Sequence, residues 1–220
     1  MCGRFVLLTD LRVITESFNV QNVACEYRPG NNISPGQEIA AIIHDDKNRL
    51  VSYRWGLIPS WAKDPSIGNR MFNARAETIT EKPSFKNAFQ KRRCLIVADG
   101  FYEWQKIGRI KKPLCFSLKS GEPFGLAGLY ETWISPEKKP VNTCTIITTE
   151  PNELMLPIHD RMPVIVGKEQ EATWIDPDNH NQKELLSILK PYPSDEMMMS
   201  QVDPRLLYKP KAQAPAFLST

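Results

Sequence analysis

The sequence predicts an α+β protein with a mixed, barrel-like β core and flanking helices. Short runs rich in β-branched and aromatic residues recur along the chain, turn signals stand between them, and few segments have helical periodicity. This pattern is typical of a sheet folded on itself. A length of 220 residues suits one sizeable core, so we expect a single domain over residues 1–220.

The apolar runs are expected to form the strands of this core. They cover residues 39–43, 50–55, 94–98, 101–104, 114–118, 124–130, 143–148 and 164–166. Turn-forming pairs separate them: Pro29-Gly30, Pro35-Gly36, Asp99-Gly100 and Ser120-Gly121.

Three segments are expected to be helical. Thr9 can cap a helix that continues to about Phe18, and Ser84 can cap one that continues through Arg92. A third helix is expected over residues 182–189, with Leu185, Leu186 and Leu189 on one face. After Tyr192 the periodicity is weak, so we expect this tail to lie loosely on the surface and to carry little chemistry.

Composition narrows the class of protein. A hydrophobic fraction of 41%, a charged fraction of 24% and a mean hydropathy of -0.37 are typical of a globular protein. No run is apolar enough to span a bilayer or to act as a signal peptide, which favours a cytoplasmic location. The net charge of +3 is too mild to indicate nucleic-acid binding by itself, so any basic surface must be local.

The cysteines do not indicate a metal or cofactor site. There are five of them, widely spaced and without a CxxC pair, and only three histidines accompany them. Cys94, Cys115 and Cys144 lie in apolar runs and are expected to be buried. Cys2 differs because of its position.

Cys2 is the leading candidate for covalent chemistry. Removal of Met1 would leave a free amine and a thiol on adjacent carbons, and such an amine has a reference pKa of about 7.7–8.0. An aldehyde would form an imine with it, and the thiol, with a reference pKa of about 8.5, would close a thiazolidine ring. The alternative is an incidental small residue at a frayed terminus.

Four motifs resemble those of one known family. They are Met1-Cys-Gly-Arg-Phe5, Asn73-Ala-Arg-Ala-Glu-Thr78, Asp99-Gly-Phe-Tyr-Glu-Trp104 and His159-Asp-Arg-Met-Pro163. Together, over residues 1 to about 166, they resemble the SOS response-associated peptidase (SRAP) family, also called abasic site processing proteins. The resemblance implies a mixed barrel and helix fold and covalent linkage of Cys2 to ring-opened abasic sites in single-stranded DNA. The tail after Tyr192 departs from the family pattern and leaves any contacts with DNA there in doubt.

Two candidate residues would move protons. Glu103 lies among aromatic residues, where desolvation would raise its pKa and suit a general acid or base. The alternative is a Glu that points outward from an alternating strand. His159 has a side chain whose reference pKa suits opening of the sugar ring, or it is a histidine bonded to a neighbouring carboxylate, as we expect for His44 and His180.

Two further candidates would hold the sugar and its phosphate. Asn73 can orient the aldehyde oxygen, and Arg75 can bind the adjacent phosphate. Alternatively, Asn73 bonds its own backbone and Arg75 pairs with Glu77 on the surface.

The DNA surface is expected to combine cations with aromatic residues. Trp61, in a loop stiffened by Pro59, is the candidate to stack on a base, whereas Trp55 is expected in the core. Lys91-Arg92-Arg93 and Lys111-Lys112 are interpreted as solvated faces. The full set of expected DNA contacts is Gly3, Arg4, Asn32, Pro35, Trp61, Arg75 and Arg161.

The leading hypothesis is thus a covalent trap for abasic sites, with slower strand cleavage as a lyase and self-processing of Met1 as further activities. Two alternatives remain: a cysteine peptidase with an N-terminal nucleophile, and a non-covalent single-stranded DNA-binding module. The expected partner is single-stranded DNA that contains abasic sites, bound by a monomer that joins the nucleoid at damaged DNA. No cofactor, metal or membrane is expected.

Overall fold

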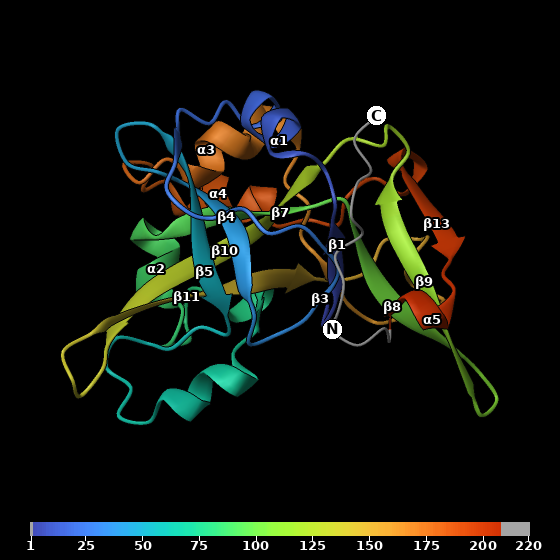
Figure 1. Cartoon of the computed structure of the whole chain (residues 1–220), viewed down its shortest axis with the longest axis horizontal. Helices are drawn as coiled ribbons and strands as arrows, with labels where there is room; N and C mark the ends of the chain where they lie inside the picture. The colour runs from blue at the N-terminus through green and yellow to red at the C-terminus, as the bar shows by residue number, and fades with distance from the viewer. Residues whose placement is uncertain (1, 208–220) are drawn as a thin grey trace, which may run out of the picture.

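The computed structural model describes residues 2–207, and five of its strands close into a barrel. These are β4 (Glu38–His44), β5 (Asn48–Trp55), β7 (Arg93–Ala98), β10 (Phe124–Ile134) and β11 (Pro140–Thr149). β11 pairs antiparallel with β10 on one side and parallel with β5 on the other, where Cys144 lies opposite Trp55. The predicted α+β class with a barrel-like core is therefore confirmed (Figure 1).

Three short strands extend the barrel sheet. β2 (Asn22–Val23) pairs with β5, while β6 (Asn73–Arg75) and β12 (Met162–Pro163) both pair with β11. The strand predicted at residues 164–166 begins two residues earlier, as β12. Val164 still donates to Ile147 and accepts from Ala127, both at 2.9 Å, so the segment stays extended between β11 and β10.

A second, antiparallel sheet lies beside the barrel, to its right in Figure 1. Its order is β13 (Met197–Gln201), β9 (Ile110–Leu118), β8 (Gly100–Ile107), β1 (Phe5–Leu7) and β3 (Gly30–Ile33). The expectation that the tail after Tyr192 lies loosely was wrong in part. β13 pairs with β9 over its whole length, and Met197 is buried against the core.

The described helices are short: α1 (Leu11–Ser17), α2 (Lys86–Lys91), α3 (Glu171–Ile175), α4 (Gln182–Ile188) and α5 (Pro204–Leu207). A six-residue 3-10 helix covers Pro65–Arg70, and single 3-10 turns cover Ala76–Thr78, Lys168–Gln170 and Ser194–Glu196. Both predicted N-caps were wrong by one residue. Asp10 caps α1 because the Thr9 hydroxyl instead donates to the Asp99 carboxylate at 2.7 Å, and Phe85 precedes α2 without a side-chain cap.

The core lies inside the barrel and between it and the second sheet. Cys94 and Cys144 are buried as predicted, and Trp55 is buried with its indole N–H donated to the Phe72 carbonyl at 2.7 Å. Cys115, expected to be buried, is only half-buried because it lies on β9 beside the edge strand β13.

Arg93 corrects the interpretation of Lys91-Arg92-Arg93 as a solvated face. Arg93 is only 2% exposed, at the start of β7. Its guanidinium donates to backbone carbonyls that follow or end α2 and α3, those of Phe89, Gln90, Trp174, Asp176 and Asn179. The cation therefore fastens two helices to the barrel, since it satisfies carbonyls that a helix end leaves without partners.

Candidate active site around Cys2

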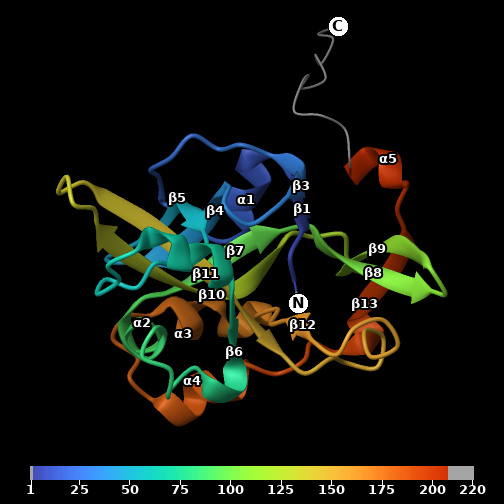
Figure 2. The same ribbon diagram turned by 90° about the horizontal axis from the view of Figure 1, so that it is seen from below.

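Cys2 lies where β1 enters the second sheet. β1 pairs with β8 at Phe5 and Phe101, and the backbone N–H of Tyr102 donates to the Arg4 carbonyl at 2.9 Å, which carries the pairing toward Glu103. Asp99 fixes the other end of β1, because its carboxylate accepts from the backbone N–H of Thr9 at 2.9 Å. Figure 2 shows the start of the chain running from β1 toward β12.

The Cys2 side chain is fully buried. Burial, together with the negative charge of Glu103, raises the pKa of its thiol to about 12. The expectation of a thiolate with an ordinary pKa of about 8.5 therefore does not hold in this structure, because an anion is poorly solvated there. At neutral pH the sulfur carries its proton.

Asn73 touches Cys2 directly. It lies on β6, where it pairs with Ile146 of β11, and its side-chain N–H donates to the Cys2 carbonyl at 2.8 Å. The alternative of an Asn that bonds its own backbone is thus not what the structure shows. The other amide atom, Oδ1, is buried and has no hydrogen-bond partner among residues 2–207. A buried acceptor of this kind is suited to a ligand donor.

Glu103 lies on β8 and points into the protein, with only 6% of its surface exposed. The alternative of an outward-pointing strand Glu is therefore wrong. Desolvation raises the pKa of its carboxyl, and the nearby charge of His159 opposes part of that effect. The carboxyl is consequently a better proton carrier near neutrality than an exposed Glu.

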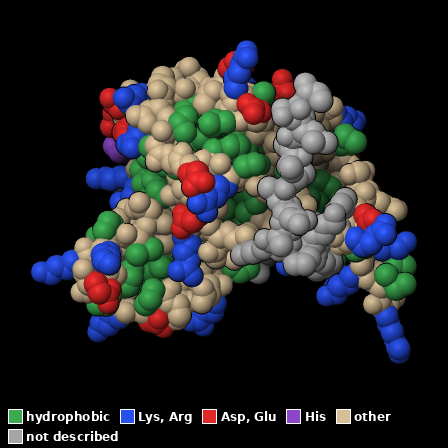
Figure 3. All heavy atoms as spheres, viewed as in Figure 1, with side chains coloured by type: hydrophobic (Ala, Val, Ile, Leu, Met, Phe, Trp, Pro, Cys, Tyr) green, Lys and Arg blue, Asp and Glu red, His purple; other side chains and the backbone are tan. Residues whose placement is uncertain are grey.

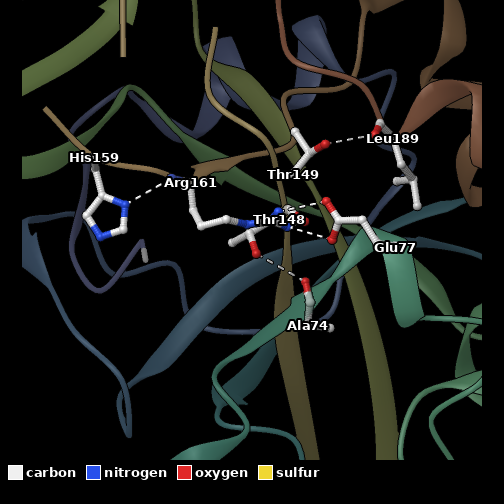
Figure 4. A network of polar contacts seen from close by, with 7 residues as sticks. All are labelled: Ala74, Glu77, Thr148, Thr149, His159, Arg161 and Leu189. Atoms are coloured by element: carbon white, nitrogen blue, oxygen red, sulfur yellow. Dashed lines mark hydrogen bonds and ion pairs between the residues drawn. The ribbon is translucent and has the colours of Figure 1, made fainter. Parts of the chain in front are cut away.

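His159 follows the turn after β11, and its side chain is 30% exposed. Nδ1 accepts the backbone N–H of Arg161 at 3.0 Å and lies 2.9 Å from an Asp160 carboxylate oxygen (Figure 4). Nδ1 cannot accept from the amide and donate to the carboxylate at once. The amide contact dominates because Asp160 is 88% exposed and solvated. In the tautomer that accepts this N–H, the ring proton is on Nε2.

Arg161 is held by Glu77 in the structure. The guanidinium donates two hydrogen bonds to the Glu77 carboxylate, at 2.7 and 2.9 Å, and one to the Thr148 carbonyl at 2.6 Å (Figure 4). The pair lowers the pKa of Glu77. The alternative pairing of Arg75 with Glu77 is thus replaced by Arg161, and the Arg75 side chain is exposed.

The structure therefore brings the four predicted catalytic residues into one cluster. Asn73 bonds Cys2, Glu103 acts electrostatically on Cys2, and His159 acts electrostatically on Glu103. They come from the start of the chain, β6, β8 and the turn before β12. An amide and a carboxyl thus adjoin Cys2, and an imidazole adjoins the carboxyl, which gives imine and thiol chemistry groups that can orient the reactants and move protons.

Some predicted DNA contacts adjoin this cluster. Gly3 and Arg4 directly follow Cys2, and Arg4 donates to Asn32 of β3 at 2.8 Å. Asn32 also donates to the carbonyl of Leu207, the last residue of α5. This contact with the C-terminal region had no sequence signal, because the weak periodicity of the tail hid its docking on β3.

Trp61 and Pro35 lie in loops that adjoin the barrel strands. Pro35 lies half-buried in the turn between β3 and β4. Trp61 is 58% exposed, although its loop is anchored on both sides by the buried residues Ile58 and Ala62, which pack against Trp133. The Trp133 indole N–H donates to the Ala62 carbonyl at 2.7 Å. The loop therefore holds an indole toward solvent on a fixed base.

No helix among residues 2–207 is long and apolar enough to cross a membrane. Within the same residues, no three His, Cys, Asp or Glu side chains are grouped so as to hold a metal ion.

Comparison with known proteins gives consistent matches. The family model described as SOS response associated peptidase (SRAP) matches residues 1–207. The chain is 49% identical to the abasic site processing protein YoqW of Bacillus subtilis over 224 residues, covering 100% of both chains. It is 31% identical to the abasic site processing protein HMCES of Xenopus tropicalis, over 76% of this chain and 59% of that protein. A crystal structure of a protein from Bacteroides thetaiotaomicron superposes with a TM-score of 0.85 at 26% identity, covering 95% of this chain and 100% of that one.

Proposed function

The chain belongs to the SOS response associated peptidase (SRAP) family, and on that premise we propose that it processes abasic sites in DNA by capturing them covalently through Cys2. The observation that carries this proposal is the hydrogen bond from Asn73 to Cys2 beside the buried carboxyl of Glu103. The names of the relatives support the lesion as the substrate, because both YoqW and HMCES are called abasic site processing proteins.

The reaction begins once Met1 has been removed and the Cys2 amine is free. The abasic sugar exists as a closed ring and an open aldehyde. As the ring opens, His159 donates a proton from Nε2 to the ring oxygen, and the C1 hydroxyl loses its proton to water to leave the aldehyde. The amine of Cys2 adds to the aldehyde carbon, and water leaves as the imine forms. Asn73 holds the backbone of Cys2 while its buried Oδ1 accepts a hydrogen bond from the sugar or the adduct.

Ring closure follows at the same carbon. The Cys2 sulfur adds to the imine carbon, the thiol proton passes to Glu103, and the nitrogen gains a proton to become the ring amine. A thiol whose pKa is raised to about 12 needs this base, because little thiolate exists at neutral pH. Glu103 is adjacent and buried, and its raised pKa lets it accept and return a proton within one reaction.

Strand cleavage would be a slower branch of the same pathway. The imine acidifies the neighbouring sugar carbon, and loss of a proton there expels the 3′ phosphate by β-elimination. Ring closure removes the imine, so a variant that forms the imine without closing the ring would cleave more. Self-processing of Met1 and peptide hydrolysis by an N-terminal Cys2 use the same amine and thiol, but no contact in the described residues favours a peptide substrate.

The decisive experiment incubates the protein with single-stranded DNA that carries one abasic site. We expect a heat-stable shifted species from the wild type and none from Cys2→Ala. Cys2→Ser retains the amine and should give an imine that borohydride traps but heat destroys. Cys25→Ala is the matched control because Cys25 is a half-buried thiol outside the cluster, and it should behave as the wild type.

Two outcomes would overturn the proposal. Heat-stable product with Cys2→Ala, which keeps the amine but lacks the thiol, would exclude ring closure by the Cys2 sulfur. Mass spectrometry that finds Met1 on the active, purified protein would leave the Cys2 nitrogen acylated and unable to form the imine. Peptide turnover by the wild type without any DNA adduct would favour the peptidase alternative.

A further inference from the structure

A hairpin formed by β8 and β9 projects from the second sheet. The two strands pair as far as Ile107, which lies opposite Ile110, and a two-residue turn joins them. Gly108 in this turn has a φ of 59°, and tight hairpin turns require such a positive φ at their first central residue. The base is buried at Glu103 and Leu114, whereas residues 106–112 are all exposed. Figure 1 shows the hairpin extending to the lower right, away from the barrel.

The exposed part carries only positive charge. Between Glu103 and Glu122 the sequence has five Lys or Arg residues and no Asp or Glu, although the net charge of the whole chain is only +3. Four of the five cations lie in the exposed segment, and among residues 2–207 none of them forms an ion pair: Lys106, Arg109, Lys111 and Lys112. Figure 3 shows Lys and Arg side chains projecting where Figure 1 places the hairpin.

The arrangement of these charges works against the hairpin itself. Lys106 lies directly opposite Lys111, and like charges at opposed positions destabilise an antiparallel pair. Ile107 and Ile110, which are 48% and 61% exposed, add an apolar pair at the end. The tip thus has positive charges that no acidic side chain of the hairpin neutralises, together with exposed apolar residues. Such a surface is suited to binding a polyanion.

The hairpin is also continuous with the candidate active site. Opposed residues in an antiparallel pair share a face, and faces alternate along each strand. Glu103 with Leu114, Gln105 with Lys112, and Ile107 with Ile110 therefore form one face that runs outward from the cluster. From Glu103 to Ile107 the strand rises four residues, or about 13 Å.

We propose that the β8–β9 hairpin is a second DNA contact, an arm that binds the phosphate backbone beside the lesion. This inference rests on the proposed function, since it assumes that the abasic sugar lies near Glu103. Phosphates along one strand of a duplex are spaced by about 3.4 Å along the axis, and a single strand can extend further, so a reach of about 13 Å corresponds to at most about four nucleotides. Lys112 lies on the same face as Glu103, whereas Lys106 and Lys111 lie on the opposite face. The strand would therefore pass around the narrow tip with phosphates near both faces, while Ile107 and Ile110 contact sugars or bases.

The test compares two double variants that each remove two Lys charges, one on the β8–β9 hairpin and one on a different hairpin. Lys111→Gln with Lys112→Gln alters the arm, and Lys138→Gln with Lys139→Gln alters the exposed turn between β10 and β11, which Figure 1 places at the other side of the molecule. Each double variant lowers the formal net charge from +3 to +1 by removing two Lys. Binding is measured in a Cys2→Ala background, to single-stranded DNA with a stable abasic analogue and either two or ten nucleotides on each side.

We expect the arm variant to lose affinity for the long DNA and to bind the short DNA as the control does. For a single strand, loss of two phosphate contacts makes the slope of log affinity against log salt concentration less steep by about 1.4. The factor by which the arm variant is weaker than the control should therefore be about sevenfold larger at 50 mM than at 200 mM salt. Equal affinity of the two double variants for the long DNA overturns the inference. So does an equal loss on both DNA lengths, because the effect would then not depend on flanking nucleotides.

The same variants with Cys2 intact separate this inference from the proposed function. If Cys2-intact protein links to the abasic DNA and the two double variants bind alike, only the arm is wrong. If no covalent product forms but the arm variant still loses affinity for long DNA alone, the arm stands as a DNA contact and the covalent mechanism fails.

Discussion

The side-chain amide of Asn73 donates a 2.8 Å hydrogen bond to the backbone carbonyl of Cys2. The contact joins β6, which is held on the barrel strand β11, to the first residues of the chain. A terminal residue is usually the most mobile part of a protein, so the bond removes freedom that would otherwise have to be lost during the reaction.

Asn73→Asp should slow formation of the DNA adduct by about tenfold or more. The carboxylate keeps the shape of the amide but cannot donate, and its charge opposes the Cys2 carbonyl; an unmet buried group of this kind costs about 1–3 kcal/mol. The measurement is the single-turnover rate of adduct formation, with the circular dichroism spectrum as a check of folding. A folded variant that reacts at the wild-type rate would remove Asn73 from the mechanism.

Glu103→Gln should slow adduct formation by about 10²- to 10⁴-fold, which is the usual contribution of a general acid or base. It should also stabilise the fold. The pKa of Glu103 is raised in the folded protein, so the wild type loses stability as pH rises through that folded pKa and the carboxyl ionises.

The thermal stability of Glu103→Gln should therefore exceed that of the wild type by an amount that grows from pH 5 to pH 8. Melting temperatures at both values measure this, and Glu122→Gln on the surface is the control. A difference between Glu103→Gln and the wild type that shrinks toward pH 8 would contradict the direction of the pKa shift.

Glu77→Gln should tighten DNA binding if Arg161 contacts a phosphate. In the free protein the Glu77 carboxylate holds the Arg161 guanidinium in two hydrogen bonds, so it competes with a phosphate for the same donors. Glu16→Gln is the matched control, because it breaks the exposed ion pair with Arg12 on α1. Affinities that change equally in both variants would reflect net charge alone and would exclude a role for Arg161.

Trp61→Ala should weaken binding to single-stranded DNA by about 5- to 160-fold, since stacking of a base on an aromatic ring contributes about 1–3 kcal/mol. Trp61→Phe should retain most of the affinity. Neither change should lower the melting temperature noticeably, because the indole is 58% exposed. Fluorescence anisotropy with a stable abasic analogue gives the affinities, and equal binding by Trp61→Ala and the wild type would exclude stacking.

Arg93→Met should destabilise the protein by about 3 kcal/mol or more. Methionine fills much of the same volume but leaves five buried or half-buried carbonyls without their donor. Arg12→Met, at an exposed position of α1, should change the stability by less than about 0.5 kcal/mol. Urea unfolding of both variants measures the difference, and a similar small effect for Arg93 would show that water replaces the guanidinium.

The sequence predicted most of the barrel because its strands are long apolar runs whose character does not depend on their partners. The strands β1, β2, β3, β6 and β13 were missed, since each is short and is defined by the strand beside it. The four motifs identified the cluster, but the pairing of Arg161 with Glu77 joins residues 84 positions apart and has no local signal. The burial of Arg93 was missed for a similar reason. A run of three cations predicts a solvent-exposed segment, and nothing in the sequence indicates that the ends of α2 and α3 supply carbonyl acceptors for one of them.

The pairing of β13 with β9 has a consequence for which backbone edge the second sheet exposes. Residues 197–201 cover a backbone edge of β9 along Leu114–Leu118, so that its N–H and C=O groups are not offered to solvent. A chain shortened before Met197 would leave these N–H and C=O groups of β9 unpaired next to apolar residues of the core. An unpaired, apolar strand edge of this kind can pair with a strand of another copy of the protein. Concentration-dependent self-association would then appear in the shortened chain although every residue of the reactive cluster is still present.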